Sequence, residues 1–314
     1  MAHRASASLD SVAREWQPEV VVDADRAAGL IGEQFPELAD APIREIGAGW
    51  DNVVYLVDDR WAFRFPQRQI AVPGVQRELD TLGRLAPHLP LPIPVPRFVG
   101  VAGQDYPWPW FGAAYLPGVE LAASGLADED RVELGASLGR FLRALHAPGL
   151  AARVGAGLPV DPMRRADMGF RVPHARRRLD AVIAEGLWQP TQAVERLLAD
   201  AAGLPPPPRT VILHGDLHVR HVLVDDCGAA SGVIDWGDVS LGDPSADLSI
   251  AFGSLAGDAR GAFVDAYGPI DRLTELRARV LATFLAAALL GYANDVRLEA
   301  LHAEALRALE RVVS

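Results

Sequence analysis

Two aspartates at the ends of a predicted hairpin are the residues in this sequence best suited to chemistry. Asp216 precedes the short apolar run Val222–Val224, and Asp235 follows a second run at 232–234. Asp225-Asp226-Cys227-Gly228 between the runs has the composition of a turn, so the hairpin should bring both carboxylates to one end. Phosphoryl transfer needs such a pair, because one carboxylate orients the attacking hydroxyl and the other holds the metal that bridges the phosphates.

Histidines surround the first of these aspartates. His221 lies five residues after Asp216, where it could join Asp235 at the metal. Mg²⁺ prefers oxygen ligands, so an imidazole is an unusual member of the site, but a neutral ring can bind a metal or hold a metal-bound water. We favour this role over simple packing of His221 on the hairpin. His214, His218 and Asp238 are secondary candidates, and for Asp238 a plain loop carboxylate is equally compatible with the sequence.

The same histidines allow a rival interpretation, a zinc-dependent hydrolase. His214, Asp216 and His218 alternate, which on a strand would place them on one face, and His221 could complete four ligands. This interpretation is weaker, because it gives Asp235 no role and finds no further cluster of ligands downstream. A kinase fold that only binds its ligands is disfavoured because both carboxylates are present.

The N-terminal third carries residues suited to holding phosphates. Gly47-Ala48-Gly49 lies between two short alternating runs, where Gly47 and Gly49 would let backbone N–H groups approach a phosphate, although a plain turn has the same composition. Arg64 is a charge inside an apolar run, so it must be paired or reach a ligand, unless it lies on an exposed strand face. Glu78, on the next predicted helix, is its natural partner.

Hydrophobic periodicity predicts an α+β chain, with a small antiparallel β lobe followed by a larger, mainly helical lobe. Leu116-Pro117-Gly118 is the expected joint, giving an N-terminal β lobe with flanking helices over 1–115 and a C-terminal lobe over 116–314 that contains the catalytic hairpin and the acceptor site. Besides the hairpin, strands are predicted at 43–46, 53–57, 61–65, 98–101, 110–115 and 211–213. Helices are predicted at 23–35, 75–85, 130–146, 176–185, 192–202, 244–255, 259–267, 272–294 and 297–313.

Composition excludes several classes of function. A formal net charge of −11 argues against a nucleic-acid partner. All 30 basic residues are Arg, so Arg must take any phosphate-binding role that Lys usually has. The single cysteine, Cys227, excludes a disulfide within the chain. Residues 1–15 lack the apolar core of a signal peptide, and the apolar run 280–293 is short enough to be a buried helix, so we expect a cytoplasmic protein with no membrane partner.

These motifs resemble the aminoglycoside phosphotransferase family, which has the two-lobed protein-kinase-like fold. The most specific part of the resemblance is His214-Gly215-Asp216-Leu217-His218 together with Ile234-Asp235-Trp236 and Gly242-Asp243-Pro244. The resemblance implies that Asp216 is the catalytic carboxylate and Asp235 the principal ligand of Mg²⁺. It also implies a nucleoside triphosphate, ATP or GTP, as the phosphate donor.

The resemblance extends into the N-terminal third. It implies that Arg64 stands where the family has a phosphate-contacting Lys, and Glu78 where the family has that residue's helix partner. Ala114 and Leu116 bound the segment that corresponds to the hinge meeting the nucleotide base.

One departure from the family pattern is specific. His221 stands where the family usually has Asn, and in this the chain is similar to the macrolide phosphotransferase branch. Residues 168–178 are basic and 284–292 are apolar, with Leu285, Leu289 and Leu290, whereas a polycationic aminoglycoside needs carboxylates around it. The same apolar residues could equally pack as core. The sequence therefore predicts transfer of a γ-phosphate to a hydroxyl of an antibiotic, a macrolide first and an aminoglycoside or another hydroxylated metabolite second.

Overall fold

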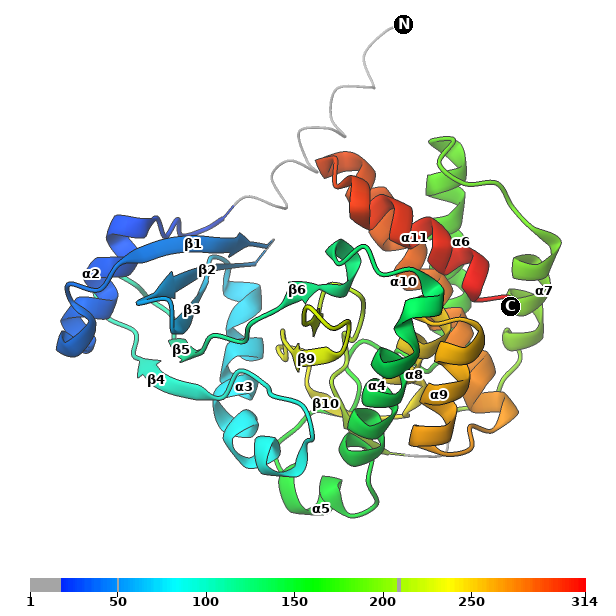
Figure 1. The fold of residues 1–314 in the computed structure, drawn as a ribbon, viewed down its shortest axis with the longest axis horizontal. Helices are drawn as coiled ribbons and strands as arrows, with labels where there is room; N and C mark the ends of the chain where they lie inside the picture. Colours follow the sequence, from blue (N-terminus) through cyan, green and yellow to red (C-terminus); the bar gives the residue numbers. More distant parts are fainter. Residues whose placement is uncertain (1–17, 50, 208–209) are drawn as a thin grey trace, which may run out of the picture. The chain divides into compact units, whose positions relative to one another are not determined.

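The computed structural model describes residues 18–49, 51–207 and 210–314 and has the predicted α+β composition, with antiparallel sheet and a large helical region (Figure 1). The chain forms two compact units. The N-terminal unit contains the described part of Met1–Arg84 together with Pro94–Tyr115, and the C-terminal unit contains Leu85–Ile93 and Leu116–Ser314.

The N-terminal unit is built on a five-stranded antiparallel sheet with the strand order β1-β2-β3-β5-β4. Its strands are β1 Ile43–Ala48, β2 Asn52–Val57, β3 Trp61–Pro66, β4 Pro96–Gly100 and β5 Trp110–Ala114. Its helical segments are α2 Ala24–Gln34, η1 Pro36–Leu38, η2 Gln69–Ala71 and α3 Val72–Leu85, the last residue of which belongs to the C-terminal unit.

The alternation of β3 separates the two faces of the sheet. Phe63 and Phe65 are fully buried among aromatic residues on the side of α2, where Phe65 stacks on Trp110 with ring centroids 4.8 Å apart. Arg64 lies between them and therefore points to the opposite face of the sheet. Its neighbour on β5, Phe111, packs with Val75 of α3, so this face is the one that α3 covers.

The C-terminal unit combines short strands with helices. The strands β6 Val119–Glu120, β8 Val222–Val224 and β9 Ala230–Val233 form a three-stranded sheet, and β7 Val211–Leu213 pairs with β10 Ser240–Gly242. The α-helices are α4 Val132–Leu145, α5 Leu150–Val154, α6 Met168–Ala184, α7 Gln192–Ala201, α8 Ser245–Ser254, α9 Gly257–Tyr267, α10 Arg272–Val296 and α11 Glu299–Arg311. The short 3₁₀ segments are η3 Ala86–His88, η4 Leu121–Ala123 and η5 Asp128–Arg131.

Helix α10 is the centre of the helical region. Its 25 residues are long and apolar enough to cross a membrane, but 56% of its most apolar window is buried inside the protein. It packs against α6, α8 and α11, which is the environment of a core helix (Figure 1). The helix is longer than the apolar run seen in the sequence, and the prediction that this run is buried is confirmed for most of its length.

Most predicted elements lie within a few residues of the observed ones, and the main differences have local causes. Helix α6 begins at Met168 rather than at 176, because Asp167 caps it and the helix continues through Pro173. Three short elements, α5, β6 and β10, were not predicted. The segment that follows α3 begins with the 3₁₀ turn Ala86–His88.

Candidate active site

The loop between β7 and β8, residues 214–221, holds most of the candidate catalytic residues. Gly215 has a φ of +91°, a conformation that glycine adopts at no steric cost. A Cβ at this position would lie 2.4 Å from the backbone oxygen of Asp238. Glycine therefore lets the loop pass directly against the segment that carries Asp235.

A buried carboxylate of α8 fixes the start of this loop. Asp247 accepts hydrogen bonds from the backbone N–H groups of His214 at 2.8 Å and Gly215 at 2.9 Å, and it lies 3.2 Å from Nε2 of His146. Burial raises the pKa of Asp247, but the hydrogen bond and charge of His146, with the other donors, lower it below its ordinary value. Asp247 thus holds the first two residues of the loop through their backbone N–H groups.

The side chain of His146 bonds away from the last carbonyls of its own helix. The residue occupies the C-cap position of α4, but its ring lies between Asp247 and the hydroxyl of Tyr267, which is 3.0 Å from Nδ1. The imidazole thus links α4, α8 and α9 behind the loop.

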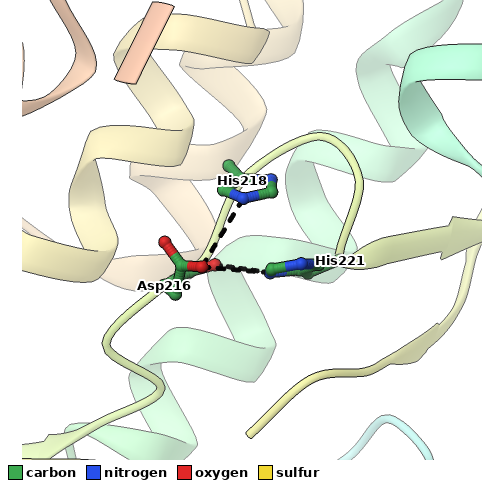
Figure 2. Close-up of side chains that lie close together, drawn as sticks. All are labelled: Asp216, His218 and His221. Atoms are coloured by element: carbon green, nitrogen blue, oxygen red, sulfur yellow. Dashed lines mark hydrogen bonds and ion pairs between the residues drawn. The ribbon is translucent and has the colours of Figure 1, made fainter. Parts of the chain in front are cut away.

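Three candidate residues meet at the far end of the loop, as Figure 2 shows. Nε2 of His218 lies 3.6 Å from Oδ2 of Asp216, and Nδ1 of His221 lies 3.8 Å from the same oxygen. The carboxylate side chain of Asp216 is 39% exposed, whereas each imidazole is 12% exposed. Asp216 is therefore accessible to a ligand, while the two rings support it from the protein side.

His221 also connects the loop to the second aspartate. Its Nδ1 lies 2.7 Å from the backbone oxygen of Asp216, and its Nε2 lies 3.4 Å from Oδ2 of Asp235. Asp235 has a φ of +62°, which is uncommon for a residue with a side chain and often occurs at functional sites. The structure thus brings Asp216, His221 and Asp235 together, as the sequence predicted.

A divalent cation fits the donor atoms of His221 and Asp235. A carbonyl oxygen only accepts hydrogen bonds, so Nδ1 of His221 carries the hydrogen and a neutral ring has its lone pair on Nε2. That lone pair and the carboxylate of Asp235 lie close together and can bind the same ion.

His214 is separated from this group. Its side chain is completely buried, its Nε2 is bonded to the backbone oxygen of Ile234 at 2.9 Å, and its Nδ1 accepts the backbone N–H of Asp216 at 3.2 Å. Burial lowers the pKa of His214, so the ring is neutral. Both nitrogens are already used within the protein, and residues 214–221 form a loop rather than a strand. The shared strand face on which the zinc interpretation depended is absent from this loop.

His218 has apolar surroundings. It lines a narrow cavity of about 30 Å³ with its neighbours Leu217 and Val219 and with Leu285 and Leu289 of α10. Burial and the nearby charges of His221 and Arg220 lower the pKa of His218 well below its ordinary value. Part of the predicted apolar acceptor face therefore lies behind the loop 214–221.

Two further predictions concern residues around this cluster. Leu290, predicted on the apolar acceptor face, is fully buried and belongs to the core. Asp238 accepts a hydrogen bond from Arg165 at 2.7 Å, and the same guanidinium bonds to Asp161 at 3.0 Å. Arg165 is a residue that the sequence did not single out, and the spacing of Asp161 and Arg165 by four residues was the available signal.

In the N-terminal unit, the predicted ion pair is present. Nη1 of Arg64 lies 2.8 Å from Oε1 of Glu78, and the two side chains are 16% and 0% exposed. The alternative of an exposed strand face is therefore wrong. A salt bridge of 2.8 Å between Arg68 and Asp51, beside the glycine turn, was not predicted.

The glycine turn and the hinge residues have simpler environments. Gly47 lies in β1, and the backbone N–H of Gly49 closes the turn by bonding to the oxygen of Asn52 at 2.8 Å. Trp50, between them, is outside the described residues. Ala114 ends β5 and is exposed, and Leu116 is half-buried in the C-terminal unit.

A larger hollow adjoins the loop 214–221 within the C-terminal unit. It has a volume of about 520 Å³ and is bounded by the loop residue Arg220. Arg220 is itself held by Glu120 at 3.2 Å. The remaining lining residues come from η4, from the turn between α10 and α11, and from the first turn of α11: Ala122, Ala123, Arg297, Leu298, Glu299, Ala300 and Leu301.

Comparison with known proteins identifies the family. The model of the phosphotransferase enzyme family, APH, matches residues 42–292 of the 314-residue chain. The chain belongs to this family. The resemblance to aminoglycoside phosphotransferases is confirmed, and the zinc-hydrolase interpretation loses its support.

Proteins similar to this APH-family chain are named for different antibiotics. Viomycin phosphotransferase of Streptomyces vinaceus is 31% identical over 189 residues, which is 57% of this chain and 63% of that protein. The GDP complex of aminoglycoside 2'-phosphotransferase-IIIa has a TM-score of 0.68 at 21% identity, covering 93% of this chain and 98% of that one. Macrolide 2'-phosphotransferase MphH from Brachybacterium faecium has a TM-score of 0.61 at 24% identity, covering 92% and 98%. Both of these structures have the same fold as this chain.

Proposed function

We propose that the protein transfers the γ-phosphate of a nucleoside triphosphate to a hydroxyl group of an antibiotic, with Asp216 as the catalytic carboxylate. The observation that carries this proposal is the convergence of Asp216, His221 and Asp235, from two segments of an APH-family chain, at a loop anchored by Asp247.

The exposed carboxylate of Asp216 suits an in-line transfer. An oxygen of Asp216 accepts the hydrogen bond of the acceptor hydroxyl and orients it toward the γ-phosphorus. As the new O–P bond forms, the bond from phosphorus to the bridging oxygen breaks. The hydroxyl proton passes to Asp216, and the nucleoside diphosphate leaves with the electron pair.

His221 and Asp235 are the residues we assign to the metal. A bound Mg²⁺ would neutralise negative charge on the phosphates. His221 would contribute Nε2 and Asp235 its carboxylate, and the hydrogen bond from Nδ1 of His221 to the backbone of Asp216 keeps the ring oriented.

In the N-terminal unit, we assign phosphate contact to Arg64 and its positioning to Glu78. The ion pair holds the guanidinium on the α3 face of the sheet, and a guanidinium recognises phosphate through several N–H groups. Gly47 and Gly49 remain proposed phosphate neighbours, and Ala114 and Leu116 proposed base contacts. Solved neighbours of this chain were obtained with GDP and with ATP, so both nucleotides belong in the test.

We place a macrolide first among the acceptors. The hollow beside Arg220 has the size of a drug-binding pocket, and five of its lining residues are Ala or Leu. Its two glutamates are matched by two arginines, so it offers no excess of negative charge to a polycationic aminoglycoside. A large, mostly apolar ring with one amino sugar suits such a lining. Viomycin is the second candidate, because its phosphotransferase is 31% identical to the aligned part of this chain.

The test is phosphate transfer by the purified protein with Mg²⁺ and either ATP or GTP. Macrolides, aminoglycosides and viomycin are offered separately, and mass spectrometry records a gain of one phosphate on each. Asp216→Asn is the inactive control and the exposed His88→Gln the matched active one. Phosphate gained by a macrolide supports the full proposal, and gain by another acceptor supports only the kinase activity. Transfer to no acceptor, or full activity of Asp216→Asn, would refute it.

A further inference from the structure

The two imidazoles beside Asp216 lie close to each other but make different hydrogen bonds. The rings of His218 and His221 stack with centroids 4.0 Å apart and planes 30° from parallel (Figure 2). With Asp216 they form a group whose ligand atoms lie within 4.8 Å of one another. By residue type and distance alone, both imidazoles could be metal ligands.

The position of the hydrogen on each ring separates their functions. Nδ1 of His221 donates to the backbone oxygen of Asp216 at 2.7 Å, which leaves the lone pair on Nε2, 3.4 Å from Asp235. Nδ1 of His218 instead accepts the backbone N–H of Arg220 at 3.3 Å. The hydrogen of His218 is therefore on Nε2, the atom that lies 3.6 Å from Oδ2 of Asp216.

We infer that the two rings divide the work: His221 binds the metal, and His218 is a positioning residue that donates its Nε2–H to Asp216. This inference deepens the proposed function and rests on it for its catalytic meaning. Hydrogen bonds at active sites are often long before substrate binds, so a separation of 3.6 Å is compatible with a bond that shortens in the complex.

The consequence is an oriented catalytic carboxylate. When His218 occupies Oδ2, the other oxygen of Asp216 is left for the acceptor hydroxyl. The same bond keeps Asp216 from turning toward the cation held by His221 and Asp235. For His218 to bind a metal through Nε2, it would have to move its hydrogen and lose the bond from Arg220.

The first test reads the hydrogen positions directly and needs no substrate. The ¹⁵N chemical shifts of the imidazoles are recorded on the full chain by long-range ¹H–¹⁵N correlation, with His218→Gln and His221→Asn used for assignment. We expect the Nε2–H form for His218 and the Nδ1–H form for His221. The same form in both rings would overturn the inference, whatever the activity of the protein.

The second test compares two replacements of His218 in the transfer assay. Leu fills the apolar surroundings but cannot donate, whereas the amide nitrogen of Gln reaches the place of Nε2. We expect His218→Leu to lower kcat by roughly tenfold or more, as for other supporting partners, with KM for the nucleotide and the Mg²⁺ requirement unchanged. His218→Gln should recover most of the rate, and His88→Gln should match the wild type.

The outcomes distinguish the two proposals. If His218→Leu raises the Mg²⁺ concentration needed for half-maximal rate, His218 is a ligand and the inference is wrong, while the kinase proposal stands. Equal rates for His218→Leu and the wild type also overturn it. If the wild type transfers no phosphate, the proposed function fails, and the ¹⁵N shifts still decide how the two rings are bonded.

Discussion

Two fully buried carboxylates of the C-terminal unit, Asp247 and Glu304, are stabilised by different partners. Asp247 is held by two backbone N–H groups and by His146. Glu304 of α11 bonds to two buried arginines, Arg131 and Arg311, which are 1% and 3% exposed, and to the more exposed Arg307. A buried carboxylate without such partners would be strongly unfavourable, so both Asp247 and Glu304 depend on the donors around them.

The difference lies in what each carboxylate holds. Asp247 bonds to the backbone of His214 and Gly215, so its position determines where the next residue, Asp216, lies. Glu304 bonds only to side chains in the hydrogen bonds described, and Arg311 continues to Asp128, so this network ties α11 to the segment before α4. We infer that losing Asp247 impairs catalysis most, whereas losing Glu304 impairs folding and leaves the site intact.

The largest expected effect is a difference in kcat between variants of Asp247 and of Glu304. Asp247→Ala should lower kcat at least roughly a hundredfold, because it releases the N–H groups that set the position of the loop, and misplacement of about 1 Å has effects of this size. Steady-state kinetics of the folded fraction measure it. Glu304→Gln is the matched control and should keep kcat within about a factor of two of the wild type. Similar losses of kcat in both variants would show that the networks do not differ in function.

The catalytic network could be predicted from the sequence only where its partners are close along the chain or belong to a recognised pattern. Asp216, Asp235 and His221 flank a single hairpin, so their meeting followed from a short-range turn. Residue types also predicted the pair of Arg64 with Glu78, because an arginine inside an apolar strand needs a partner.

Contacts between distant segments were not predictable in the same way. Arg165 reaches Asp238 across 73 positions, and Arg131 reaches Glu304 across 173. No periodicity encodes such a distance. The inward turn of His214 depends on the φ of Gly215 and on the bonds to Asp247, which the alternating histidines could not reveal. Helix α6 begins earlier than predicted, at Met168, because Asp167 caps it and the helix continues through Pro173.

A second prediction measures the stability of the Glu304 network. Glu304→Gln removes the carboxylate that pairs with the buried Arg131 and one of the two carboxylates that pair with Arg311, and breaking a buried pair in this way costs about 3 kcal/mol or more. We expect a free energy of unfolding lower by about this amount in chemical denaturation. Glu133→Gln is the control, since its pair with Arg140 is largely exposed and surface pairs contribute little. Equal stabilities of the two variants would contradict the assigned role of Glu304.

The pH dependence of stability should sharpen the contrast. Burial raises the pKa of Glu304, but hydrogen bonds and charge from Arg131 and Arg311 outweigh it and lower the pKa from 4.5 to about 2. Because the folded pKa is the lower one, the contribution to stability is complete above 4.5 and is lost as the pH falls toward 2. The difference in unfolding free energy between wild type and Glu304→Gln should therefore shrink across this range. A constant difference would show that Glu304 is not titrating as assigned.

The smallest expected effect on kcat and stability is that of Tyr267, which contacts Asp247 through His146. Tyr267→Phe removes the hydroxyl that lies 3.0 Å from Nδ1 of His146, but it keeps the ring that stacks on Phe263. One hydrogen bond contributes about 1 kcal/mol, so a modest loss of stability is expected. His146 still bonds to Asp247, and the loop keeps both N–H contacts, so kcat should fall only a few-fold. A loss of kcat as large as that of Asp247→Ala would mean that the position of the loop depends on the whole chain of bonds rather than on the carboxylate alone.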